Sequence, residues 1–466
     1  MTRRLGLLAI AGAAGVLSLG APSAEAARGL RLGINDGVYE TADAGTRHAW
    51  LSRTVDARAN LVLLGASWAS IAPSNRPPGF DARDPADPAY SWGALDAAVR
   101  DATAGGLRVM ILVTGAPQWA EGASRPGFRR APPGTWKPSP GKLADFGHAI
   151  AVRYSGSFGT LPRVRYWQLW AEPNLSIYLT PQWVHHRAAT PKHYRSMLNA
   201  FYGAVKGVSR RDVVITGGTA PYGDPAGGDR MRPVRFWRGV LCLRGEKLRP
   251  ARCKNPAHFD VIAHNPINVG PPKRHAVNRN DASTPDLGRI ERVVRKARHT
   301  SRVRPRGPKP FWATEIWWDS KPPDPHGIPE RTHARWLEQA LYLLWRQGAR
   351  TAVWFQIRDQ ARLPDFASTY QTGLFLRSGK PKLAYRAFRF PFVGDRTGRR
   401  QVRVWGKAPR KGKVQIQRRR HSHWRTLKRL RAGSNRVFTG SVRVRGKAKL
   451  RAKQRPGKSL TWRQKG

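Results

Sequence analysis

Acidic residues are scarce in this chain. Its 466 residues hold 29 Asp and Glu against 84 Lys and Arg, which gives a formal net charge of +55. The imbalance is sharpest near the C-terminal end, where no acidic residue follows Asp395. A field of this sign repels cationic partners and attracts anionic polymers such as acidic polysaccharide, wall phosphate polymers or nucleic acid.

Cysteine is almost absent as well. Cys242 and Cys253 are the only two, and no His lies beside them at the spacing of a zinc site. Two isolated thiols at this spacing make a poor metal site, and no convincing metal triad is seen elsewhere in the sequence. We expect no cofactor. An even cysteine count in an exported chain predicts one disulfide, which would close a short loop.

Long apolar runs are missing beyond the N-terminal region. No later segment reaches the roughly 18 uninterrupted apolar residues of a membrane-spanning helix. The N-terminus itself combines Arg3 and Arg4 with an apolar run over Leu5–Leu19 and the small residues Ala24 and Ala26. This pattern predicts a signal peptide over residues 1–26 and a secreted protein, which would stay cell-wall associated if its basic end binds the wall. An uncleaved membrane anchor is the alternative.

Short β-rich runs alternate with amphipathic helical runs from about Leu30 to Phe390. Eight strands are expected, at Leu30–Asn35, Asn60–Ala66, Leu107–Thr114, Arg163–Ala171, Asp212–Gly217, Phe259–His264, Pro310–Glu315 and Thr351–Gln356. Helices are expected between them, at Trp92–Ala104, Lys142–Tyr154, Pro191–Lys206, Asp286–Arg298 and Glu330–Arg346. The alternation predicts an α/β fold, a (β/α)₈ (TIM) barrel over residues 27–392. A doubly wound sheet is disfavoured, because no glycine-rich phosphate turn follows the first strand.

A different pattern follows Phe392. Short runs such as Val402–Trp405, Val414–Gln417, Arg436–Phe438 and Val442–Val444 alternate apolar with basic or polar residues, and Gly-containing turns separate them. We expect a small all-β domain over residues 393–466 with a basic outer face. That face could bind an anionic cell-wall polymer, bind an acidic or sulfated glycan, or be a solvated surface with no specific partner. The export signal argues against a nucleic-acid partner.

Two glutamates end predicted strands that are rich in aromatic residues. Glu172 follows Tyr166–Ala171 and precedes Pro173, and Glu315 follows Pro310–Thr314. The carboxyl ends of barrel strands converge around one axis, where active sites lie. Glycoside hydrolysis needs two carboxyl groups that flank the scissile bond. The alternative for each glutamate is a structural ion pair with one of the many Arg residues.

The residues around both glutamates resemble a known family. Trp170–Asn174 resembles the Asn-Glu-Pro motif of clan A glycoside hydrolases, closest to families 39 and 5, and Ala313–Trp317 resembles their nucleophile strand. The likeness covers about residues 30 to 390 and includes Gly115–Ala120, Phe259–His264, and Gly373–Phe375 followed by Pro381–Tyr385. It implies a retaining enzyme for a β-linked glycan, with Glu172 as general acid/base and Glu315 as nucleophile, and no metal.

Two positions depart from the family pattern. The family's Asn before the acid/base is Ala171 here, and a methyl group cannot make the hydrogen bond to a sugar 2-hydroxyl that this Asn commonly makes. The His-Pro-Tyr common on the sixth strand is replaced by His264-Asn265-Pro266-Ile267, which removes a Tyr that often contacts the nucleophile. A second hypothesis is therefore a catalytically impaired barrel that binds cell-surface or cell-wall carbohydrate. In a third hypothesis, the basic C-terminal segment carries the function of the protein.

Several residues at strand ends are candidates for sugar binding. Sugar rings stack their C–H faces on aromatic side chains, and amides and imidazoles bind hydroxyl groups. The alternative for each candidate is a place in the barrel or loop core. The substrate-binding candidates are Trp68, Trp119, Asn174, His264, Trp317 and Trp354.

Overall fold

The computed structural model describes residues 26–465. The predicted signal peptide, residues 1–26, thus lies almost entirely outside the described residues. Within residues 26–465, no helix combines the length and the apolar character needed to cross a membrane.

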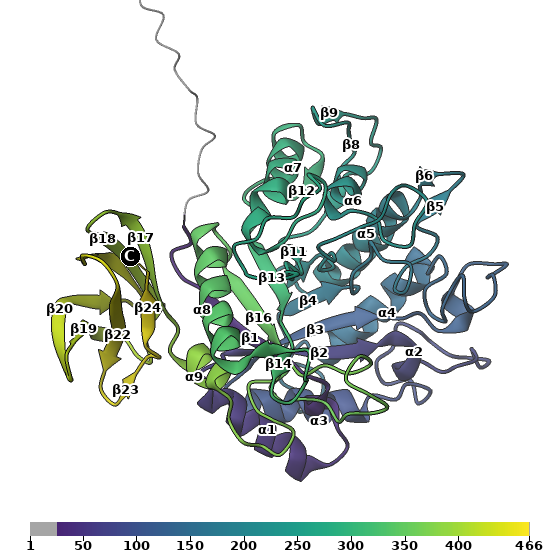
Figure 1. Ribbon diagram of the computed structural model, residues 1–466. Coiled ribbons are helices and arrows are strands. Elements are labelled where there is room, and N and C mark those ends of the chain that lie inside the picture. Colours follow the sequence, from purple (N-terminus) through teal and green to yellow (C-terminus); the bar gives the residue numbers. More distant parts are fainter. Residues whose placement is uncertain (1–25, 466) are drawn as a thin grey trace, which may run out of the picture.

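A barrel of eight parallel strands forms the larger part of the protein, as predicted (Figure 1). The strands pair in the order β11-β13-β16-β1-β2-β3-β4-β7. Parallel bridges from Ile215 to Val261 and from Thr219 to His264 bring the two ends of this sheet together. The strands are β1 (Arg31–Asn35), β2 (Leu61–Ser67), β3 (Arg108–Thr114), β4 (Tyr166–Leu169), β7 (Val213–Ile215), β11 (Ile262–His264), β13 (Phe311–Ile316) and β16 (Thr351–Phe355).

Helices surround the barrel because each has one apolar stripe that packs on the strands. In α8 the buried Ala334, Leu337, Leu341 and Leu344 recur at the spacing of one helix face. The helices are α1 (Ala44–Asp56), α2 (Trp68–Ile71), α3 (Gly93–Ala104), α4 (Pro140–Arg153), α5 (Thr190–Val208), α6 (Pro233–Val240), α7 (Leu287–His299), α8 (Glu330–Arg346) and α9 (Leu383–Arg389), with 3-10 turns η1 (Gly37–Glu40), η2 (Gln118–Ala120) and η3 (Thr284–Asp286).

Long connections follow the carboxyl ends of several strands. Residues 170–189 separate β4 from α5, and residues 356–382 separate β16 from α9. In a barrel these connections build the face that carries the active site. Short strand pairs stiffen some of the loops: β5 (Trp183–Val184) with β6 (Arg187–Ala188), β8 (Leu243–Arg244) with β9 (Arg249–Pro250), β10 (Ala257–His258) with β12 (Val303–Arg304), and β14 (Ser320–Lys321) with β15 (Ile328–Pro329).

Antiparallel strands follow the barrel, also as predicted. One sheet has the order β17-β18-β21, and the other has the order β20-β19-β22-β23, with β24 paired to β22. The bounds are β17 (Phe392–Gly398), β18 (Gln401–Lys407), β19 (Gly412–Arg420), β20 (His423–Ala432), β21 (Val437–Arg443), β22 (Ala448–Gln454), β23 (Gly457–Lys458) and β24 (Trp462–Gln464). The expected turn between Phe438 and Val442 is wrong. β21 runs through Gly440 because every residue of this strand pairs with β18.

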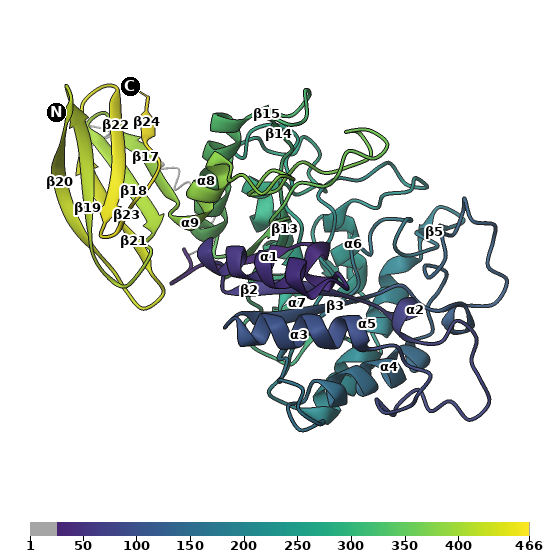
Figure 2. The same ribbon diagram turned by 90° about the horizontal axis from the view of Figure 1, so that it is seen from below.

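The C-terminal sheets pack against α8 and α9 of the barrel (Figures 1 and 2). Trp405 of β18 lies 5.8 Å from both Tyr342 and Trp345 of α8, measured between ring centroids. The backbone N–H of Phe392 donates to the buried Glu338 of the same helix, 3.3 Å away. Barrel and sheets thus share one apolar interface.

The predicted disulfide is present. Cys242 and Cys253 are bonded and close a loop of sequence separation 11 beside α6. This loop contains the β8–β9 hairpin, so the bond joins the two ends of the hairpin.

Candidate active site

Glu172 lies just beyond the end of β4 in a strained backbone conformation. Its φ angle is 29°, and that of Trp170 is 70°, both in the left-handed region that few non-glycine residues adopt. The Trp170 indole N–H holds the turn by donating to the Tyr178 carbonyl at 2.7 Å. Strain of this kind collects where a side chain must be aimed at a ligand.

An amide from the end of β11, two strands around the barrel from β4, holds the Glu172 carboxyl group. Asn265 follows β11, and its Nδ2 donates to Glu172 Oε1 at 3.0 Å. Its Oδ1 accepts from the Thr314 hydroxyl on β13 at 2.9 Å. Gly218 makes room for this arrangement, because a Cβ there would collide with Asn265 and Thr314. The buried chain therefore connects the β4, β11 and β13 ends of the barrel.

Glu315 lies inside β13 and is held from its own strand end. The Trp317 indole N–H donates to Glu315 Oε1 at 2.9 Å. The Trp317 ring packs on Tyr370 with 5.2 Å between centroids, and Tyr370 packs on Phe355 at 5.1 Å. Glu315 thus lies beside an aromatic wall built from the ends of β13 and β16.

The two carboxyl groups influence each other's ionisation. Burial raises the pKa of Glu172, against the lowering effect of the Asn265 hydrogen bond. Burial also raises the pKa of Glu315; the charge of Glu172 raises it further, and the Trp317 hydrogen bond opposes both. Because like charges at close range resist double ionisation, the pair carries a single negative charge over an intermediate pH range. That state offers one proton donor and one carboxylate, and the charge of Glu172 favours the proton on Glu315 while no substrate is bound.

Two tyrosines lie near both glutamates. The pKa of Tyr178 is raised by burial and by the charges of Glu172 and Glu315, and the same causes act on the pKa of Tyr370. The two residues are 39% and 40% exposed, so both are accessible to solvent beside the carboxyl pair. An aromatic face beside a carboxyl pair can stack on a sugar ring.

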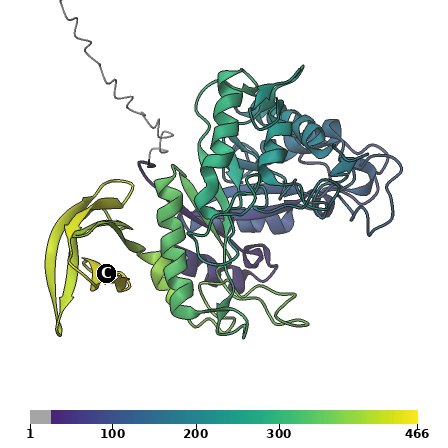
Figure 3. The same cartoon turned by 45° about the horizontal axis from the view of Figure 1, so that its top comes forward.

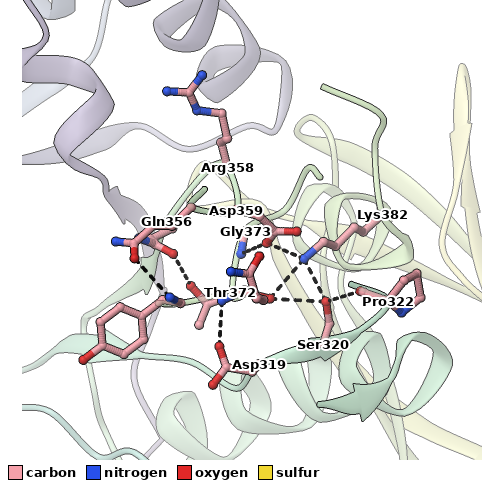
Figure 4. A network of polar contacts seen from close by, with 12 residues as sticks. Asp319, Ser320, Pro322, Gln356, Arg358, Asp359, Thr372, Gly373 and Lys382 are labelled. Carbon is pink, nitrogen blue, oxygen red and sulfur yellow. Dashed lines mark hydrogen bonds and ion pairs between the residues drawn. The ribbon is translucent and has the colours of Figure 1, made fainter. Parts of the chain in front are cut away.

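A buried polar network holds the loop that carries Tyr370 (Figure 4). The Lys382 ammonium donates to Asp359 at 2.5 Å, to the Ser320 hydroxyl at 2.8 Å and to the Gln371 carbonyl at 3.1 Å. Asp319 accepts from the Gln371 N–H at 2.7 Å. This network fastens the chain after Trp317 to the chain around Tyr370, so it fixes the aromatic wall from behind.

Four of the predicted sugar-binding residues belong to the core instead. Trp68 is fully buried and stacks on Phe146, and Trp354 is fully buried with its indole N–H donated to the Thr372 carbonyl. Asn174 and His264 are also fully buried. The Asn174 amide contacts only backbone groups, of Ala220 and Met231, and the two His264 ring nitrogens contact the Thr219 hydroxyl and the Ala282 carbonyl. Successive side chains of a strand point to opposite faces of the sheet, so a position at a strand end alone could not distinguish a core residue from an accessible one.

The two other candidates keep part of their surface accessible. Trp317 is half-buried at Glu315, as described above. Trp119 is half-buried over Trp68 and Phe80, and its indole N–H donates to the Pro73 carbonyl at 2.8 Å. In residues 26–465, no three His, Cys, Asp or Glu side chains gather closely enough to hold a metal ion.

The sequence prediction missed Asn265, Tyr178, Tyr370 and Phe355. Asn265 had a signal, because it is the polar residue that follows His264 at a strand end and stands in the altered His-Pro-Tyr motif. The two tyrosines lie in loops at no fixed distance from a strand end. Only the folded loops bring them to the carboxyl pair.

The barrel with its following antiparallel strands is similar to the folds of solved glycoside hydrolases. No family model matches the chain, and no curated protein is similar to it in sequence. A family 39 glycoside hydrolase from Bacteroides cellulosilyticus WH2 shares the fold with a TM-score of 0.53 at 15% identity, over 90% of this chain and 79% of that one. A monomeric β-xylosidase from Caulobacter crescentus CB15 gives 0.51 at 14% identity, over 91% and 96%.

The family 39 enzyme from Xanthomonas axonopodis pv. citri matches similarly, with a TM-score of 0.51 at 12% identity over 91% of this chain and 93% of that one. Residues 27–392 are less than four fifths of the 466-residue chain, so these coverages include part of the C-terminal strands. The resemblance drawn from the motifs is thereby confirmed at the level of the fold.

Proposed function

We propose that this protein is a retaining glycoside hydrolase that acts on a β-linked glycan. The observation that carries the proposal is the carboxyl pair beside an aromatic wall, in which the charge of Glu172 raises the pKa of Glu315. Acid–base chemistry on a glycosidic bond needs such a pair in its singly charged state. The shared barrel fold supports the proposal.

In the first step Glu315 attacks the anomeric carbon while Glu172 protonates the departing oxygen. The bond between the anomeric carbon and that oxygen breaks, and an ester forms between the sugar and Glu315. In the second step Glu172, now a carboxylate, takes a proton from water. The water oxygen attacks the anomeric carbon and releases Glu315. The Trp317 N–H stabilises the charge on Glu315 before attack and after release.

Asn265 supports Glu172 through this cycle. Its amide N–H favours the carboxylate form, which Glu172 adopts between the two steps. Ala171 brings no amide to the site, so Asn265 is the side-chain amide hydrogen-bonded to the acid/base here. We infer a positioning role for Asn265, fixed by Thr314.

We also propose that residues 1–26 direct export. The disulfide between Cys242 and Cys253 supports this, because stable disulfides are typical of oxidising compartments.

The deciding experiment is turnover of a panel of aryl β-glycosides by the full chain, its Glu315→Ala variant and its Glu172→Ala variant, each with and without azide. We expect azide to rescue Glu315→Ala with an α-glycosyl azide as product, since azide attacks in place of the missing nucleophile. Rescue of Glu172→Ala should give a β-glycosyl azide, formed from the sugar ester.

Glu291→Ala is the matched control. Glu291 is a half-buried glutamate of α7 whose pKa burial raises to about 7, and it lies outside the site. This variant should keep wild-type turnover. If wild type is inert on every glycoside yet binds oligosaccharides, the second candidate stands, a carbohydrate-binding barrel that lost its chemistry with the Ala171 replacement.

A further inference from the structure

A groove runs between α8 of the barrel and the sheet of β19, β20, β22 and β24. Two hollows of about 630 and 900 Å³ follow one another along it, and both are lined by Arg335, Arg419 and Arg463. Figure 3 shows the curved C-terminal sheet with its hollow side toward α8. The groove is therefore built by two separate parts of the chain.

Half of the residues that line this groove are Lys or Arg. Seven Lys and Arg side chains line the first hollow and eight line the second, with three shared, so twelve cations face one channel. Among the described residues, none of these twelve makes an ion pair with a carboxylate. Glu338 is the single acidic residue of the lining, and burial raises its pKa well above the ordinary value. The groove thus has uncompensated positive charge along its whole length.

Two of the arginines in the groove stack on tryptophan rings. The Arg335 guanidinium lies 3.9 Å from the Trp462 ring centroid, and that of Arg451 lies 4.0 Å from the ring centroid of Trp424. Stacking fixes the plane of each guanidinium. Arg335 also donates to the Arg463 carbonyl at 3.1 and 3.2 Å, and Arg451 Nε donates to Gln417 Oε1 at 2.8 Å, so the remaining N–H groups of each arginine are available to oxygen anions. The groove therefore presents two cations of fixed orientation among its solvated ones.

We propose that this groove binds a linear anionic polysaccharide through its carboxylate or sulfate groups. Charges spread along a channel fit a polymer with repeated charges better than a single small anion. Single-stranded nucleic acid binds by stacking bases on open aromatic faces. Here Trp462 is only 3% exposed and lies under Arg335, and the Trp424 ring lies beside Arg451. The preference for a polysaccharide rests on the proposed function, whereas the anion binding does not.

The test compares two triple variants of the full chain that lose the same charge. Arg419→Gln, Lys449→Gln and Arg463→Gln neutralise exposed groove residues, and Arg100→Gln, Arg210→Gln and Arg306→Gln neutralise exposed barrel residues. Glutamine keeps much of the aliphatic stem, so packing changes little.

Dissociation constants are measured at 150 mM salt for polygalacturonate, dextran sulfate, neutral dextran and a single-stranded DNA of matched charge. We expect the groove variant to bind the preferred charged polysaccharide about tenfold or more weakly than wild type, because each exposed contact to a polyanion adds to affinity. The barrel variant should stay within about twofold of wild type, and neutral dextran should not bind. The carboxylated and sulfated probes show which anion is preferred.

Equal losses in both triple variants would overturn the proposal, because binding would then follow net charge alone. Tighter binding of the DNA than of either charged polysaccharide would overturn the ligand class. The measurement is repeated on Glu315→Gln, which should bind the polyanion like wild type. An inert barrel therefore leaves this result untouched, and a groove without affinity leaves the hydrolase proposal untouched.

Discussion

Replacing Lys382 by Met should destabilise the protein far more than a surface charge change does. The side chains of Lys382 and its partner Asp359 are 2% and 0% exposed. Methionine fills a similar volume but donates none of the three hydrogen bonds that reach Asp359, Ser320 and Gln371. Asp359 would then keep a buried charge with no cation beside it. Breaking a buried pair from one side costs about 3–5 kcal/mol of unfolding free energy.

The effect should depend on pH in a defined direction. Burial raises the pKa of Asp359 to about 6 even with Lys382 beside it, and without that ammonium the pKa rises further. A protonated Asp359 needs no cation, so the loss from Lys382→Met should be small near pH 5. It should grow as pH rises through and above 6, because ionisation of the buried carboxyl is then forced.

The double variant Lys382→Met with Asp359→Asn isolates the cause. Asparagine removes the charge but keeps an oxygen for the Gly373 N–H, which donates to Asp359 at 2.9 Å in the wild type. We expect the double variant to lose only about 1–3 kcal/mol, the range for unsatisfied neutral acceptors. Arg279→Met is the surface control, since the Arg279–Glu246 pair is 76% and 58% exposed and should contribute at most about 1 kcal/mol.

Urea unfolding followed by tryptophan fluorescence at pH 5 and pH 8, at fixed ionic strength, gives the free energies. Hydrogen exchange over residues 357–373 reports on the Tyr370 loop, which should lose protection in the single variant. A cost of under about 1 kcal/mol for Lys382→Met at pH 8, or a double variant no more stable than the single one, would refute the unpaired charge of Asp359 as the cause.

Three further predictions concern the site and the disulfide. Glu315→Gln should raise the urea midpoint relative to wild type at pH 8 but not near pH 4.5, because the raised pKa of Glu315 means that its ionisation destabilises the fold as pH rises. An equal difference in midpoint at both pH values would contradict the pKa shift. Trp317→Phe should move the acidic limb of the pH profile of kcat to higher pH by about one unit, because the lost indole N–H had lowered the pKa of Glu315. An unmoved limb would mean that this hydrogen bond does not affect the pKa of the nucleophile. Cys242→Ser with Cys253→Ser should lower the unfolding free energy by about 3 kcal/mol for a loop of separation 11, and reductant should then have no effect on the variant.

The sequence alone determined the barrel and the positions of its strands. Continuous apolar runs such as Leu61–Leu64, buried on both faces, can only be central strands of a parallel sheet, and the helices between them keep one apolar stripe. These patterns are local and do not depend on distant contacts. The glutamates at the ends of β4 and β13 were visible for the same reason, because the residue that ends a barrel strand is placed at the rim by the strand itself.

Tertiary structure alone decided what surrounds those glutamates. Trp68 and Trp354 were expected at the substrate and lie in the core, whereas Tyr178 and Tyr370 come to the carboxyl pair from loops. The path of a long loop depends on contacts with residues distant in sequence, such as those of Lys382, and such contacts leave no periodic pattern in the sequence. The basic groove depends on such contacts in the same way, because α8 and the C-terminal strands form it only when they pack together. Sequence patterns indicate the surroundings of a residue within its own helix or strand, whereas a site is formed by residues from several helices, strands and loops.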